Sequence, residues 1–320
     1  MICWNDFEMN EAGRALGHDL HKLSLIAPHA SWPAVVREGF DAAAHAGQRR
    51  QRADRFVAKW LQLRLSAWRR GRRVADDVTP ALLRDIDVPR CPITRQPLTH
   101  GSLQDTDWSV DRLNNDAAYA ASNLAVMSVK ANRAKGALNF QQVYARSQQA
   151  ADSDGLRPVE WLRLAVLMLG PAYATQAHAA PILPLCAPLP CRSVRLAPQQ
   201  VQRLLTVNGA RHADKNRLIR TLAQACNSEI ARERLLFLGE AVHEGLKRIT
   251  PSEECWDVWL QPAVLQALMR WHDALDPSTW ARVAALSGQL SGARPETPRR
   301  LQAWCLPTRG YAPRLMTGWC

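Results

Sequence analysis

Cysteine is scarce in this sequence, with eight residues among 320 that are spread widely along the chain. This spacing excludes the disulfide-dense scaffolds of small secreted proteins. The first residues also lack the apolar run of a signal peptide, because Asp6, Glu8 and Glu11 interrupt them. We therefore expect a cytoplasmic protein whose thiols are reduced.

Charged side chains are absent from residues 164–191, a stretch long enough to cross a membrane. Five prolines interrupt this stretch: Pro171, Pro181, Pro184, Pro188 and Pro190. Each proline in a helix interior removes a backbone hydrogen bond and clashes with the preceding turn. We therefore expect no membrane partner, and predict an ordered connector over residues 171–198.

The composition is that of a globular protein, since 47% of the residues are hydrophobic and 22% are charged. These values exclude a mainly disordered or fibrous chain. The pattern of helical spacings and prolines predicts a mainly α, multi-domain protein. We expect four regions: a helical region over 1–88, a small embedded unit over 89–150, a helix and connector over 151–197, and a helical domain over 198–320.

Positive charge is concentrated within residues 49–73, which hold ten basic side chains and one acidic side chain. Helical spacing places many of them on one face, opposite the apolar side chains of Phe56, Trp60 and Leu63. Aligned charges of one sign repel one another unless a polyanion lies against them, which indicates nucleic acid. A solvated face, an acidic protein or a membrane surface are the alternatives. The candidate contacts are Arg49, Arg52, Arg55, Lys59, Arg69 and Arg73.

Residues 91–136 contain the clearest local pattern. Residues 91–97 read as a tight knuckle, and residues 108–113 alternate like a strand. Ser122 is a suitable N-cap for a predicted helix that runs to Lys135 and ends at Gly136. Such a unit brings Asp111 close to Asn132, and a carboxylate with an amide oxygen suits a hard cation such as Mg²⁺.

This segment resembles the HNH, or ββα-metal, endonuclease family, and its phage-type branch in particular. Asp111 falls at the metal-binding aspartate of the family, and Asn123-Leu124 at its Asn-Leu pair. Met127 takes the hydrophobic place, Asn132 the final Asn/His place and Lys135 the lysine. The resemblance implies an embedded ββα fold and metal-dependent hydrolysis of nucleic acid, with DNA as the expected substrate and with Mg²⁺ or Mn²⁺ held by Asp111 and Asn132.

The segment departs from the family at its general base and its zinc ligands. Arg112 occupies the place of the family's catalytic histidine. In a related nuclease pattern the histidine comes three residues after the aspartate, and Asn114 occupies that place here. Because an arginine stays protonated, it is a candidate phosphate contact, as is Lys135. Of the four zinc cysteines only Cys91 is present, so we expect no structural zinc.

Three hypotheses for the function follow. The first is an HNH-like nuclease of phage or mobile-element ancestry with Asp111, Arg112, Asn123 and Asn132 at its catalytic site. Its base would be metal-bound water or one of His100, Asp105, Asp107 and Tyr119. The second is a catalytically inactive unit of the same fold that serves DNA binding or assembly.

The third hypothesis is a helical scaffold whose residues 198–320 bind a protein partner or a second copy of the chain. Half of the twelve tryptophans lie in this region, and we expect most of them in its core. They are Trp256, Trp259, Trp271, Trp280, Trp304 and Trp319.

Overall fold

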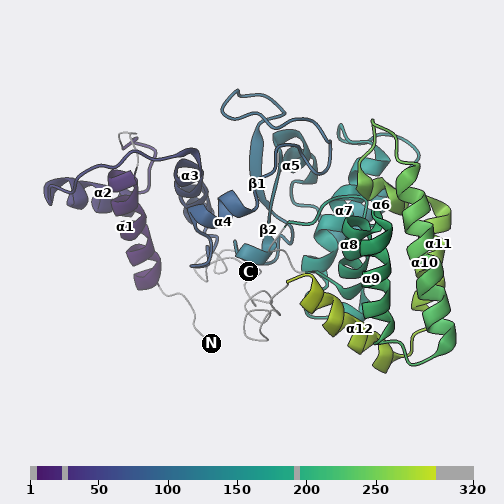
Figure 1. Cartoon of the computed structure of the whole chain (residues 1–320). Helices are drawn as coiled ribbons and strands as arrows, with labels where there is room; N and C mark the ends of the chain where they lie inside the picture. Colours follow the sequence, from purple (N-terminus) through teal and green to yellow (C-terminus); the bar gives the residue numbers. More distant parts are fainter. Residues whose placement is uncertain (1–5, 24–27, 191–194, 293–320) are drawn as a thin grey trace, which may run out of the picture. The chain divides into compact units, whose positions relative to one another are not determined.

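The computed structural model describes residues 6–23, 28–190 and 195–292, and Figure 1 shows the course of the chain. The described chain is mainly helical and includes a two-stranded antiparallel sheet, as the predicted class requires. It divides into two compact units. Described residues of Met1–Pro89 and Val110–Val126 form the first unit, and those of Arg90–Ser109 and Met127–Pro298 form the second. The four-region division expected from the sequence stays a prediction.

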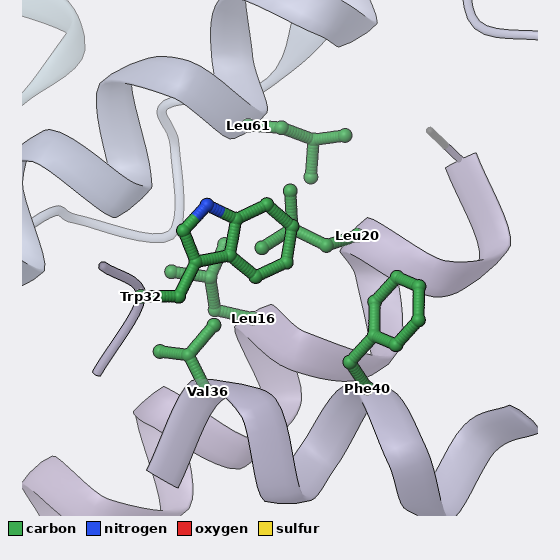
Figure 2. Close-up of a cluster of buried hydrophobic side chains, with 6 residues drawn as sticks. All are labelled: Leu16, Leu20, Trp32, Val36, Phe40 and Leu61. Carbon is green, nitrogen blue, oxygen red and sulfur yellow. The ribbon is translucent and has the colours of Figure 1, made fainter. Parts of the chain in front are cut away.

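The first unit is built around four helices: α1 (Asp6–Leu23), α2 (Ala34–His45), α3 (Arg55–Arg69) and α4 (Pro80–Asp85). Figure 2 shows one cluster of its core, in which side chains of α1, α2 and α3 meet around Trp32. Its buried members are Leu16, Leu20, Trp32, Val36, Phe40 and Leu61. Burial of such side chains is the main stabilising term for a small unit.

Two glycines allow α1 and α2 to approach closely. A Cβ atom on Gly17 would lie 2.1 Å from the carbonyl oxygen of Val36, and one on Gly39 would lie 2.1 Å from that of Arg14. Both clashes are with backbone, which cannot move aside cheaply. Glycine at these two positions therefore sets the distance between the helices.

The basic helix α3 is shorter than the basic segment of the sequence. The Asp54 side chain accepts a hydrogen bond from the Val57 amide and caps the helix, so Arg49 and Arg52 precede it. The chain leaves the helical path at Gly71, whose φ is +59°. Phe56, Leu61, Leu63 and Ala67 form the buried face.

The predicted helix over 122–135 is wrong for its first half. Residues Leu124–Ser128 form strand β2, which pairs with β1 (Trp108–Arg112), after a 3₁₀ turn at Ala121–Asn123. All five residues of β2 are buried, and a continuous buried run of this length favours a strand. Helix α5 (Val129–Lys135) begins only at Ser128, whose hydroxyl accepts a hydrogen bond from Ala131. The predicted strand and the stop at Gly136 are confirmed.

The knuckle predicted at residues 91–97 is present in the second unit. The Cys91 amide donates to the Gln96 carbonyl, and the Arg95 amide to the Cys91 carbonyl. The Cys91 sulfur accepts from the amides of Thr94 and Ser128, at 3.5 and 3.3 Å. Cys91 is thus a fully buried part of the packing.

Helix α6 (Phe140–Ser147) lies within the region 89–150, and α7 (Pro158–Ala172) is the helix expected within 151–197. After a 3₁₀ turn at Ala177–Ala179, the described part of the connector packs in an extended form against α8 (Ala197–Gly209). The Gln202 side chain bonds the Leu185 amide and the Leu183 carbonyl, at 2.7 and 3.0 Å. Among the described residues, no helix is both long and apolar enough for a membrane span.

The rest of the second unit is helical, as expected, and consists of α8 (Ala197–Gly209), α9 (His212–Ala223), α10 (Glu229–Lys247), the 3₁₀ helix η3 (Cys255–Leu260), α11 (Pro262–His272) and α12 (Pro277–Leu290). Trp259 and Trp271 are fully buried, which confirms their predicted place in the core. Trp256 and Trp280 are half-buried, whereas Trp304 and Trp319 lie outside the described residues.

Candidate functional site

The two predicted metal ligands lie on different elements. Asp111 is half-buried on β1 and belongs to the first compact unit, whereas Asn132 is half-buried on α5 in the second. The Asn132 amide nitrogen donates to the Ser109 hydroxyl at 2.7 Å. This bond fixes the orientation of the amide, whose oxygen is the atom that a hard cation would take.

Asn123 holds the loop that joins β1 to β2. Its side chain is fully buried. The amide nitrogen donates to the carbonyls of Asn114 and Ala118, at 2.9 and 3.0 Å, and the side-chain oxygen accepts from the Asn114 amide at 2.7 Å. All the hydrogen-bonding atoms of the side chain are thereby engaged with backbone. In this structure Asn123 organises the loop that follows Asp111.

Arg112 and Lys135, both predicted to contact phosphate, are buried. Arg112 is 8% exposed and donates to the carbonyls of Asn115 and Ala117, at 3.0 and 2.9 Å. Its guanidinium also lies over the Tyr119 ring, 4.9 Å from the centroid. Lys135 is fully buried. Both side chains are therefore poorly placed to contact a phosphate group.

The basic segment keeps several exposed arginines. Arg49 and Arg52 are exposed, and neither makes a hydrogen bond or ion pair with the described part of the chain. Arg69 is exposed and donates to the Ser31 carbonyl at 3.0 Å. Arg55 is half exposed and pairs with Asp87 at 2.5 Å. Lys59 and Arg73 are half-buried.

Of the candidate bases, two are committed to other contacts. Asp107 accepts hydrogen bonds from Thr99 and from the amides of Ser102 and Leu103, which lower its pKa below the ordinary value. The buried Tyr119 hydroxyl accepts from Arg70 at 2.7 Å. A group that serves as base must accept a proton, which the bonds around Asp107 oppose.

His100 and Asp105 remain the accessible base candidates. His100 is exposed, and its ring packs edge-on against Trp108 with 5.3 Å between the centroids. Asp105 is exposed and pairs with Arg133 at 3.0 Å.

A cavity of about 540 Å³ beside α5 was not foreseen from the sequence. Lys130, Arg133 and Arg146 line it together with Asp105 and Asp154. Arg133 pairs with Asp105, and Arg146 pairs with Asp154. These residues lie within positions 105–155 but match no local motif, so the sequence offered no signal for a cavity.

A buried ionic network in the second unit was also missed. Arg95 of the knuckle forms a two-pronged ion pair with Asp257 of η3. Arg163 of α7 lies 3.6 Å from the same carboxylate and donates to the Ile93 carbonyl at 3.1 Å. The partners are separated by up to 162 positions, so only the fold reveals the network.

Zinc ligation was not expected, and the structure describes no group of three or more His, Cys, Asp or Glu residues that could hold a metal. The pair of Asp111 and Asn132 is not a group of this kind, since it has two members and one of them is an asparagine. Cys91, Cys186 and Cys226 are buried free cysteines, whereas Cys255 is exposed. Cys191 lies outside the described residues.

Cys186 is expected to resist alkylation in the folded protein. Burial raises the pKa of its thiol to about 12, so the thiolate is nearly absent at pH 8. Native protein treated with iodoacetamide should be labelled at Cys255 before Cys186, as read by peptide mass spectrometry. In denaturant both should react at similar rates; faster labelling of Cys186 in the native state would contradict this assignment.

Comparisons with known proteins identify no relative, since no protein-family model, no curated protein and no solved structure matches this chain.

Proposed function

We propose that this chain binds DNA and, with a divalent metal ion, hydrolyses a phosphodiester bond at the segment that contains β1, β2 and α5. The observation that supports this proposal is the order strand, clamped loop, strand and helix. Asp111 lies on the first strand, Asn123 clamps the loop, and Asn132 lies on the helix. These are the places at which the sequence resembles the HNH family.

The donor chemistry suits Mg²⁺ or Mn²⁺. Magnesium in phosphoryl-transfer sites is commonly held by one or two protein oxygens together with substrate phosphate and water. Asp111 would supply a carboxylate and Asn132 an amide oxygen. The metal, when bound, stabilises charge on the phosphate and on the leaving oxygen. Ser109 orients Asn132 through the bond at 2.7 Å.

The residue at the place of the general base cannot perform that role. Arg112 cannot accept a proton, and its guanidinium is bonded within its own loop. His100 and Asp105 are the accessible alternatives among the candidates. Loss of a general base costs a factor of roughly 10²–10⁴, so we expect slow hydrolysis.

A second candidate function is DNA binding without cleavage. The buried Arg112 at the place of the catalytic histidine favours it, because the residue stabilises the loop and supplies no base. The exposed arginines of the basic segment serve either function.

Cleavage is tested with supercoiled plasmid, linear duplex, single-stranded DNA and RNA in Mg²⁺, Mn²⁺ or EDTA. We expect slow, metal-dependent nicking of DNA that falls at least about tenfold in Asp111→Ala and in Asn132→Ala, because each removes a metal ligand. Asp116→Ala, an exposed acid of the same loop, is the matched control. Equal cleavage by both ligand variants would contradict the metal site, and absence of cleavage with retained binding would favour the second function.

Binding is tested by the salt dependence of affinity for a duplex. Each lost phosphate contact should reduce the slope of log K against log salt by about 0.9. The variant Arg49→Gln, Arg52→Gln should therefore lower it by up to about 1.8. The control is the double variant Arg211→Gln, Arg220→Gln, which removes the same charge from two exposed positions elsewhere, one at the N-cap of α9 and one within that helix. Equal changes of the slope in the two variants would mean that the basic segment is not the site of DNA binding.

A further inference from the structure

Helix α10 exposes large apolar side chains to solvent. Ile230, Leu236 and Phe237 are 57%, 57% and 58% exposed, while the opposite face of the helix is buried. Met269 of the neighbouring α11 is 38% exposed, and the carbonyl of the next residue, Arg270, accepts from Arg234 of α10 at 2.8 Å. Figure 1 shows α10 and α11 side by side. We call Ile230, Leu236, Phe237 and Met269 the α10 patch; contiguous apolar patches mark interaction surfaces.

Two opposite charges on α10 are placed symmetrically about Phe237. Phe237 lies one residue from the middle of the helix Glu229–Lys247. Arg234 precedes it by three positions and Glu240 follows it by three. Both residues are exposed, and the Glu240 side chain keeps 56% exposure although it pairs with Lys215. The surface around Phe237 is therefore complementary to its own antiparallel copy.

We propose that two copies of this chain associate through α10, packed antiparallel about a twofold axis at Phe237. In this arrangement Phe237 meets Phe237, and Arg234 of each copy faces Glu240 of the other, so that each ion pair occurs twice. Isologous interfaces require this kind of self-complementarity. Ile230 of one copy lies against Ala241 and Glu244 of the other.

The charge pattern favours a second copy over an unrelated partner. A surface for a strongly acidic or basic protein would have charge of one sign around its apolar centre, whereas exposed side chains of both signs surround Phe237, among them Arg232, Glu233, Arg234 and Glu240. The dimer goes beyond the proposed function, because it assigns a role to the C-terminal helices. Each dimer also has two basic segments.

Sedimentation equilibrium of the full chain tests the association. We expect a monomer–dimer equilibrium with a dissociation constant on the order of 10–100 μM, since the patch is smaller than a standard interface. Phe237→Glu and Arg234→Glu should each weaken dimerisation at least about tenfold. Leu103→Glu, at a position that is 99% exposed, is the matched control and should leave the dimer unchanged. A monomeric wild type at 100 μM, or dimers retained in Phe237→Glu, would overturn the proposal.

Cysteine cross-linking tests the geometry separately. Phe237→Cys places thiols at the twofold axis and should give a disulfide-linked dimer under mild oxidation. Glu229→Cys lies eight residues from the axis, so two copies would be about 24 Å apart and should not cross-link. Circular dichroism of each variant verifies folding. Faster cross-linking of Glu229→Cys than of Phe237→Cys would exclude the antiparallel packing.

Discussion

The variant Asp257→Asn is expected to lower the free energy of unfolding by about 3–5 kcal/mol. Asp257 is 5% exposed, pairs with Arg95 through both oxygens, and faces Arg163 at 3.6 Å. Removing its charge leaves Arg163 and Arg95 without their closest carboxylate, and Glu254 then faces only Arg95, at 3.7 Å. A buried charge that loses its partner keeps the cost of desolvation and loses the attraction that offsets it.

Urea denaturation at pH 7 measures this effect. The control is Glu11→Gln, which breaks an exposed ion pair with Arg14 of 2.8 Å and should cost less than about 1 kcal/mol. A cost below about 1 kcal/mol for Asp257→Asn would show that the network adds little to stability.

The dependence of the free energy of unfolding on pH, measured at acid pH, provides a second test. Burial opposes ionisation of Asp257, but its bond to Arg95 outweighs this and holds the pKa below the ordinary value. The pair therefore stabilises the fold above the unfolded pKa of about 3.9, and this contribution is lost as the pH falls through the lower folded pKa. The difference between wild type and Asp257→Asn should be constant near neutrality and shrink below about pH 4.

Asn123→Ala is expected to lower the free energy of unfolding by about 3 kcal/mol. Three hydrogen bonds of 2.7–3.0 Å between its side chain and the loop backbone are lost. Each is worth about 1 kcal/mol, and the carbonyl of the buried Ala118 loses a partner as well. Hydrogen exchange at residues 113–120 should accelerate more than in the α1–α2 region.

The matched control is Asn208→Ala, whose amide donates to the Leu204 carbonyl within its own helix at 2.8 Å. This bond is half exposed, so its loss should cost less than about 1 kcal/mol. Similar destabilisation by both variants would mean that Asn123 has no special role in the loop.

Contacts between protein atoms hold the knuckle in place. The Cys91 sulfur accepts two amide hydrogen bonds, and the turn is tied to α7 and η3 through Arg163 and Asp257. Arg95 itself adopts a φ of +61°, which is uncommon for a residue with a side chain.

The sequence by itself determined the helical class, the basic helix, and the strand that carries Asp111. These follow from local signals: apolar spacing, and stops such as Gly71 and Gly136. The same signals failed at Leu124–Ser128, where burial between other elements favours a strand and the true cap is Ser128. A short apolar run fits either structure, so tertiary burial decided between them.

Only the tertiary structure decided which charges are available for function. Arg112 and Lys135 look like surface cations in the sequence, yet both are buried, whereas Arg49 and Arg52 stay exposed. The pairing of Arg95 with Asp257 joins residues 162 positions apart, and no local pattern encodes such a contact. The exposure of a side chain depends on what packs over it, and in a compact chain those neighbours come mostly from distant segments.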